Sequence, residues 1–138
     1  MTKTSYSNAS QPLIVLLACT ATPCTNVANW QAHTVYTAAQ ANPRAILLID
    51  PEHQKLHIFS TDTGTGNGIH HNVSDMSNIQ FANATDVPFI KNADDVKINN
   101  STSTKQHVNS GTGILIAASS QSTYFYYHNC ISLSGGGG

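Results

Sequence analysis

Histidines beside an acidic residue are the side chains with the clearest capacity for chemistry in this sequence. His53 and His57 stand four residues apart directly after Glu52, and His70 and His71 are adjacent. Imidazoles and carboxylates bind zinc and related metals. Residues four apart share a face on a helix, however, whereas on a strand they stand about 13 Å apart. Because this region has strand character, we expect turn and strand histidines and no metal site, unless the fold brings the two pairs together.

A glycine-rich stretch at residues 62–68 offers two other kinds of chemistry. Its D-x-G-x-G-x-G spacing occurs in the cofactor loop of S-adenosylmethionine-dependent methyltransferases, and its first three residues form the Asp-Thr-Gly triplet of aspartic proteases. Ser60 and Thr61, which precede it, are more polar than the strand that leads into either motif, and no convincing helix follows. A turn between strands is the simpler interpretation, so we expect no catalytic residue and no cofactor.

The cysteines form an odd set: Cys19, Cys24 and Cys130. This count is not typical of a disulfide framework, so we expect reduced thiols and a reducing compartment. No fourth metal ligand accompanies the three thiols, and a buried free cysteine behaves as a small hydrophobe. Residues 16–19 look like a bacterial lipoprotein cleavage box, but their apolar run is shorter than the roughly 7–15 residues of an export signal.

Composition limits the class of partner. Of 138 residues only 9% are charged, with a net charge of −1, against roughly 25% charged residues in ordinary soluble domains. Without a basic run, nucleic acid and acidic membrane surfaces are disfavoured as partners. No segment approaches the roughly 18 apolar residues of a membrane-spanning helix. The length fits one domain.

Apolar runs bounded by turn residues predict the elements that position these side chains. Residues 45–50 and 55–60 flank a short connection that contains Pro51 and predict a β-hairpin. Residues 13–19 predict a buried strand. Residues 25–42 predict the one helix, because their apolar positions fall on one stripe and Pro43 ends it.

A second hairpin is predicted near the end of the chain, from residues 113–118 and 123–133 around a polar turn. Its second strand holds four consecutive aromatic residues. Because alternate strand residues share a face, we expect half of them in the core and half on a surface or interface. The two sets are Phe125 with Tyr127, and Tyr124 with Tyr126.

These elements predict a mainly β fold of the α+β kind, a small β-barrel or sandwich built on hairpins with one helix. We expect an extended polar N-terminal arm at residues 1–11, a single β-rich domain at residues 12–134, and a flexible glycine tail at residues 135–138. Residues 61–110 are predicted to form loops and short strands.

The two hairpins share a pattern of residues. In the first, an apolar strand ends in Asp, and a polar connection leads to Lys-Leu and an aromatic; in the second, Gly-Ile-Leu and Phe-Tyr flank a polar turn. The residues are Asp50, Lys55, Leu56 and Phe59, and then Gly113, Ile114, Leu115, Phe125 and Tyr126. This pattern resembles the lambda-type head decoration, or cement, proteins of tailed bacteriophages. The segment between the hairpins is longer than in that family, and Phe59 stands where the family has an indole.

The resemblance implies a non-enzymatic structural protein of the virion, made in the host cytoplasm and carried on the capsid surface. It implies a β-rich homotrimer that binds the major capsid protein at three-fold positions and stabilises the shell. The N-terminal arm would add a strand to the shell through its backbone, with Tyr6 as its large anchor. The arm residues concerned are Thr2, Lys3, Thr4, Ser5, Tyr6 and Ser7.

Other functions stay open on the sequence. A tail tube, fibre or adaptor subunit of a phage would have nearly the same composition. A carbohydrate-binding β-sandwich would use Tyr124, Tyr126, Trp30 and surface asparagines. A small enzyme would use residues 62–68.

Overall fold

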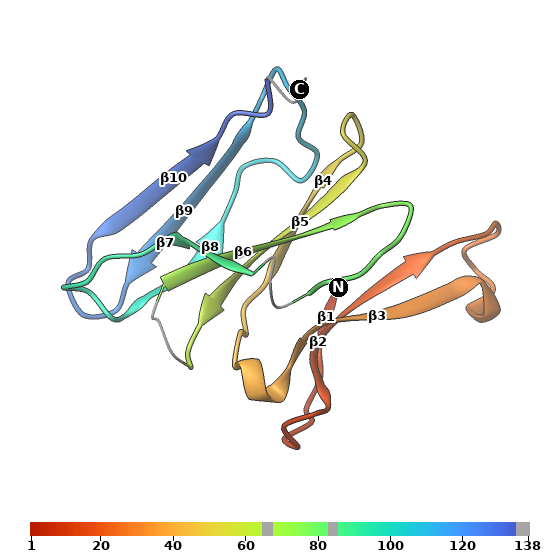
Figure 1. The fold of residues 1–138 in the computed structure, drawn as a ribbon, viewed down its shortest axis with the longest axis horizontal. Helices are drawn as coiled ribbons and strands as arrows, with labels where there is room; N and C mark the ends of the chain where they lie inside the picture. Colours follow the sequence, from red (N-terminus) through yellow and green to blue (C-terminus); the bar gives the residue numbers. More distant parts are fainter. Residues whose placement is uncertain (65–67, 83–85, 135–138) are drawn as a thin grey trace.

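The chain folds into three antiparallel sheets, seen in a computed structural model that describes residues 1–64, 68–82 and 86–134 (Figure 1). The first sheet has the order β1-β2-β3, with β1 (Thr2–Lys3), β2 (Pro12–Cys19) and β3 (Trp30–Thr37). The second has the order β4-β5-β6-β7, with β4 (Ile46–Asp50), β5 (Lys55–Asp62), β6 (Gly68–Asp75) and β7 (Val87–Ile90). The third has the order β10-β9-β8, with β8 (Ile98–Thr102), β9 (Ile114–Ser120) and β10 (Tyr126–Ile131). The fold is therefore mainly β, as predicted, but these sheets do not close into a barrel.

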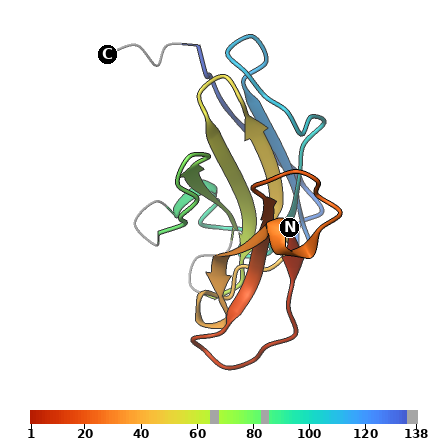
Figure 2. The same ribbon diagram turned by 90° about the vertical axis from the view of Figure 1, so that its right-hand side faces the viewer.

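Strand β5 is covered on both faces and contributes side chains to both hydrophobic cores. Leu56 and Ile58 pack on one face against residues of β2 and β3. Phe59, from the other face, packs against residues of β8 and β9. The alternation along the strand therefore divides the apolar residues between two cores. Figure 2 shows the molecule turned so that the first sheet faces the viewer.

Both predicted hairpins and the predicted strand at residues 13–19 are confirmed. Strands β4 and β5 pair from Ile46 opposite Phe59 to Asp50 opposite Lys55. Strands β9 and β10 pair along their whole length. Strand β2 covers the apolar run after Gln11. These elements share strong local signals, namely apolar β-branched runs and polar turns.

The predicted helix at residues 25–42 is wrong. Residues 30–37 form strand β3, and only two short 3-10 turns flank it, η1 (Val27–Asn29) and η2 (Ala38–Gln40). β-branched and aromatic residues favour a strand, and pairing with β2 buries Val35 and Tyr36 to 2% and 0% exposure. The apolar stripe had the spacing of a helix, but sheet pairing decided the outcome.

The expectation of fully reduced cysteines is also wrong. Cys19 and Cys24 form a disulfide, with their Cα atoms 5.8 Å apart, and Cys130 is free and exposed. The turn between β2 and β3 brings the first two cysteines within the span of a disulfide. An odd number of cysteines is therefore compatible with one disulfide between two cysteines that are close in sequence.

The N-terminal segment lies along the first sheet. Thr2 and Lys3 pair with β2, and the backbone N–H of Thr4 donates to the carbonyl of Leu13 at 2.9 Å. Tyr6 is 52% exposed. The segment thus forms the edge of the sheet at β1.

We predict that Phe59→Ala destabilises the protein by about 3–5 kcal/mol, because it removes a large ring from a fully buried site. Phe125→Ala is the matched control, since Phe125 is 64% exposed and its loss should change the free energy of unfolding by less than about 0.5 kcal/mol. Urea unfolding measures both. Equal effects of the two substitutions would contradict the core described here.

We also predict that the folded protein, purified without reductant, has one reactive thiol per chain, from Cys130. Reduction and unfolding should raise this number to three, because the bond between Cys19 and Cys24 opens. Titration with a thiol-reactive dye measures both values. Three reactive thiols before reduction would rule out the disulfide.

Candidate functional site

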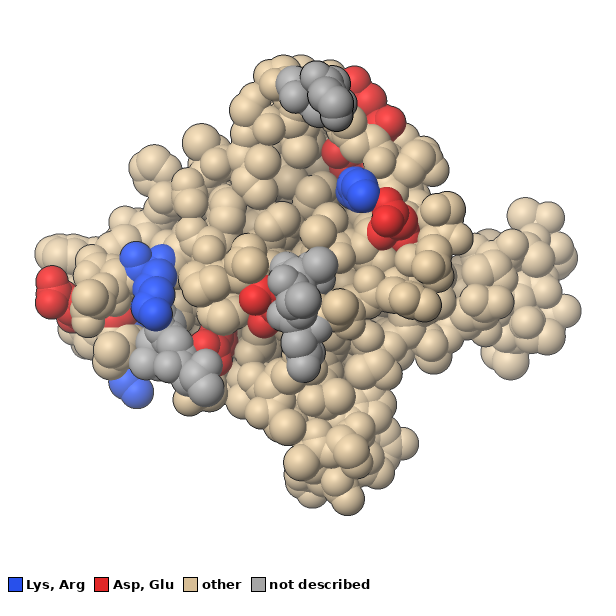
Figure 3. Space-filling model, viewed as in Figure 1, with Lys and Arg blue, Asp and Glu red and all other residues tan. Residues whose placement is uncertain are grey.

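A projecting hairpin, which we define as residues 17–32, extends the first sheet away from the rest of the molecule (Figure 1). The sequence has no Lys, Arg, Asp or Glu between Thr4 and Pro43. Figure 3 shows the projection at the right without charged atoms on this face. Three apolar side chains are exposed on it, Leu17 at 46%, Val27 at 86% and Trp30 at 42%. Exposed apolar side chains on an uncharged projection make this surface a candidate for contact with another protein.

Local bonds hold the end of the projecting hairpin in one shape. The disulfide joins Cys19 to Cys24, and the indole Nε1 of Trp30 donates to the carbonyl of Cys24 at 2.7 Å. The side chain of Asn29 donates to the carbonyl of Pro23 at 3.0 Å. A surface that is already ordered loses less conformational entropy when it binds.

The open edges of the first sheet are β1 and β3. The predicted arm residues Thr2 and Lys3 lie in β1, Thr4 follows, and Ser5, Tyr6 and Ser7 are exposed in the turn toward β2. Edge strands present backbone groups to which another chain can add a strand. The structure therefore brings the arm residues to one side of the same sheet that carries the projecting hairpin.

The residues predicted in the first hairpin serve mainly to stabilise the fold. Leu56 and Phe59 belong to the two cores, and Lys55 pairs with Asp75 at the surface. The buried carboxylate of Asp50 accepts hydrogen bonds from the backbone N–H of His53 at 3.0 Å and from its ring Nδ1 at 2.7 Å. Asp50 therefore stabilises the turn between β4 and β5.

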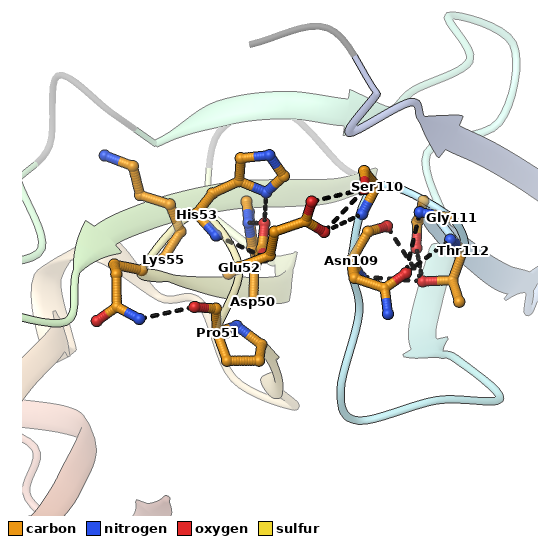
Figure 4. Close-up of polar contacts among 12 residues, drawn as sticks. Asp50, Pro51, Glu52, His53, Lys55, Asn109, Ser110, Gly111 and Thr112 are labelled. Carbon is orange, nitrogen blue, oxygen red and sulfur yellow. Dashed lines mark hydrogen bonds and ion pairs between the residues drawn. The ribbon is translucent and has the colours of Figure 1, made fainter.

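A contact between loops extends this turn to the third sheet. Figure 4 shows Glu52 facing Ser110, which lies in the loop before β9. The Glu52 carboxylate accepts from the backbone N–H of Ser110 at 2.7 Å and from its hydroxyl at 2.7 Å. These hydrogen bonds lower the pKa of Glu52. The carboxylate thus adds to the backbone hydrogen bonds that join Ile49 of β4 to Gln106 and Val108 of the same loop.

The second hairpin ends in an exposed aromatic turn, residues 124–126. Tyr124, Phe125 and Tyr126 are 81%, 64% and 86% exposed. The prediction that half of the four aromatic residues lie in the core is wrong, since only Tyr127 is partly buried. The chain is left-handed at Tyr124, with φ of 61°, and β10 begins only at Tyr126, so strand alternation does not extend over all four residues. Elsewhere in this hairpin Ile114 is buried and Leu115 is 50% exposed.

The aromatic turn is held from beneath by Asp95, which sequence reasoning missed. Asp95 is only 2% exposed. Its carboxylate accepts from the hydroxyls of Ser120 at 2.8 Å, Ser122 at 3.0 Å, Thr123 at 2.7 Å and Tyr127 at 2.9 Å. Burial opposes ionisation, but hydrogen bonds from Thr123, Ser120 and their neighbours outweigh it and lower the pKa of Asp95. No local sequence signal links Asp95 to hydroxyls more than twenty residues away.

The histidines of β5 and β6 lie on two opposite faces of the middle sheet. Rings of β5 and β6 stack on the face toward the third sheet: Phe59 on His71 with centroids 4.5 Å apart, and His71 on His57 at 5.2 Å. His57 Nδ1 also lies 2.9 Å from His71 Nε2. His70 points to the opposite face, where a hydrogen bond with Asp86 at 3.1 Å raises its pKa. Strand alternation thus separates the adjacent histidines.

Among the described residues, no group of three or more His, Cys, Asp or Glu side chains is arranged to hold a metal ion. Within the same residues, no helix is long and apolar enough to cross a membrane.

The glycine-rich stretch is described only in part, since residues 65–67 lie outside the described residues. The Asp62 carboxylate accepts from the backbone N–H of Gly64 at 2.8 Å and lies 3.5 Å from His70 Nε2.

The aromatic residues considered for carbohydrate binding do not lie together. Trp30 opens β3 at the right of Figure 1, whereas β10, with Tyr126, begins at the left.

Comparisons with protein-family models, curated proteins and solved structures find no match for this chain. The projecting hairpin is an exposed, uncharged surface with a fixed shape.

We predict that acid destabilises the protein through His71. Burial, followed by the nearby His57, lowers the pKa of His71 to about 4. An unfolded histidine binds its proton near pH 6.5, so the unfolded state takes up a proton first as the pH falls. Stability is full above about pH 6.5 and should fall by on the order of 3 kcal/mol between that pH and about 4.

Urea unfolding across this pH range tests the effect, with His71→Phe as the comparison because it keeps a ring against Phe59. The variant should lose less stability than the wild type over the same window. An identical pH dependence in the two proteins would contradict the assignment to His71.

Proposed function

We propose that this chain is a non-enzymatic structural protein of a phage particle, a decoration protein that binds the head shell through its first sheet. The observation that carries the proposal is the projecting hairpin, an ordered and charge-free extension with Leu17, Val27 and Trp30 exposed. The resemblance of the two hairpins to lambda-type cement proteins supports the choice of a capsid as the partner.

The composition of the projecting hairpin suits a protein partner. The centres of protein interfaces are depleted of charged residues and enriched in aromatic ones. Trp in particular contributes strongly to binding when it becomes fully buried. Because no ion must be stripped of water here, covering this surface costs little desolvation energy. Its neutral polar side chains remain available for hydrogen bonds at the rim.

The edge at β1 supplies a second mode of attachment. Strand β1 pairs with β2 on one side only, so its other side can pair with a strand of the capsid protein. Tyr6, at the adjacent turn, would anchor that strand. The arm and the projecting hairpin would thus bind neighbouring parts of the same shell surface.

A homotrimer, as the resemblance implies, would present three copies of this surface to a three-fold position of the shell. Each additional attachment occurs at the high effective concentration set by the first, so moderate contacts yield stable occupancy. The protein would then reside on the virion surface and stabilise the shell by joining neighbouring subunits. Neither a cofactor nor nucleic acid is required for this role.

We predict that Val27→Lys weakens binding to undecorated phage heads by about tenfold or more, because it places an unpaired charge in the contact. Val27 is 86% exposed, so its replacement should leave the fold unchanged. Val87→Lys is the matched control, since Val87 is 48% exposed on β7, in a different sheet. Co-sedimentation with heads measures occupancy of the wild type and both variants.

Stoichiometric pelleting of the wild type and of Val87→Lys, with loss of Val27→Lys, is the expected result. A wild-type protein that stays in the supernatant would overturn the capsid assignment. Equal pelleting of the two variants would overturn the placement of the contact on the projecting hairpin.

A further inference from the structure

Half of the chain's basic residues gather at one hollow. The sequence has six Lys and Arg residues. Three of them, Lys3, Arg44 and Lys97, line a hollow of about 300 Å³. Lys3 comes from β1, Arg44 precedes β4 and Lys97 precedes β8, so all three sheets contribute. The volume is at the lower end of the range for small-molecule sites.

The arrangement around Arg44 has an unusual backbone. Arg44 and Asn100 both have positive φ, 57° and 56°. The guanidinium of Arg44 donates to the side-chain oxygen of Asn100 at 3.1 Å, and the backbone N–H of Asn100 lies 3.3 Å from the hydroxyl of Thr61. Non-glycine residues adopt this conformation at an energetic cost, and such residues cluster at functional sites. The bonds fix the guanidinium beside the hollow.

The hollow has an excess of positive charge. Asp62 is the acidic residue among those lining it. Its carboxylate accepts from the backbone of Gly64 and lies 3.5 Å from His70 Nε2, and it is 3% exposed. Three exposed cations thus face one buried carboxylate that already has partners. In a chain so poor in charge, this is a local field that attracts anions.

The remaining lining is neutral and mixed. Thr63, Asn99 and Gln121 supply a hydroxyl and two amides, and Pro43 and Val96 supply apolar surface. Asn99 is buried and its side-chain amide donates to the carbonyl of Lys97 at 2.9 Å, so the exposed Thr63 and Gln121 carry the polar groups that a ligand can reach. Ligand hydroxyls can donate to the Thr63 hydroxyl and form hydrogen bonds with the Gln121 amide, and a sugar ring combines such hydroxyls with an apolar face for Pro43 and Val96. Among the described residues that line the hollow, none is aromatic and able to stack on a nucleobase.

We propose that this hollow binds an acidic saccharide, a sugar unit that carries a carboxylate, sulfate or phosphate group. Lys3, Arg44 and Lys97 would hold the anionic group, and the Gln121 amide and the Thr63 hydroxyl would bind the ring hydroxyls. The site is separate from the projecting hairpin, so its test does not depend on the decoration role.

Isothermal titration calorimetry of the full chain tests the proposal with four probes. 3′-Sialyllactose carries a carboxylate, a heparin-derived disaccharide carries sulfates, lactose is the neutral sugar, and inorganic phosphate is the anion without a sugar. We expect at least one acidic sugar to bind about tenfold or more tightly than both lactose and phosphate, and to weaken with added salt. The stronger of the two identifies the acidic group.

Variants place the site. Lys97→Gln and Arg44→Gln should each weaken binding about tenfold, because each removes a charge-assisted contact. Lys105→Gln is the control, since Lys105 is exposed and lies outside this hollow, and it should bind as the wild type does. Circular dichroism confirms that the variants fold.

The proposal fails if neither acidic sugar binds the wild type, or if Lys97→Gln and Lys105→Gln bind equally well. Phosphate that binds as tightly as the acidic sugars would overturn the saccharide assignment.

Discussion

Strand β5 is buried on both faces, and the positions of the other elements depend on this. Its Leu56 and Ile58 need the first sheet as cover, while Phe59 needs the third. A shift of one residue in its pairing would exchange the two faces and place a histidine among aliphatic side chains. Two-sided burial therefore sets the register of the middle sheet. It also explains why a chain of this length builds three small sheets and two cores.

Buried carboxylates act as organisers of loops in a protein that has few charges. Asp50 holds the β4–β5 turn through His53, and Asp95 gathers four hydroxyls beneath the aromatic turn. Burial of these side chains is tolerated because hydrogen-bond donors surround their oxygens. The few acidic residues thus shape surfaces from below, whereas the exposed surfaces rely on neutral polar groups. This division leaves strands β2 and β3 and the projecting hairpin free of charged residues and suited to contact with another protein.

The two proposed sites bind through different interactions, apolar contact at the projecting hairpin and charge attraction at the hollow. The projecting hairpin depends on the absence of charge, since an apolar, ordered surface is cheap to cover. The hollow depends on a concentration of charge that is rare elsewhere in the chain. Strand β1 belongs to both, because its edge lies on the first sheet and its Lys3 reaches the hollow. An anion bound there would contact the same strand that is proposed to meet the capsid.

Local patterns in the sequence determined the mainly β class, both hairpins and strand β2, because apolar runs and turn residues act over a few neighbours. Tertiary structure decided the rest. Residues 25–42 have helical spacing, yet pairing with β2 makes a strand of residues 30–37. The disulfide, the Asp95 network and the hollow of Lys3, Arg44 and Lys97 join residues whose proximity depends on how the chain turns. Hydrophobic periodicity does not predict such contacts, since the disulfide depends on the β2–β3 turn and the other two depend on how the sheets pack.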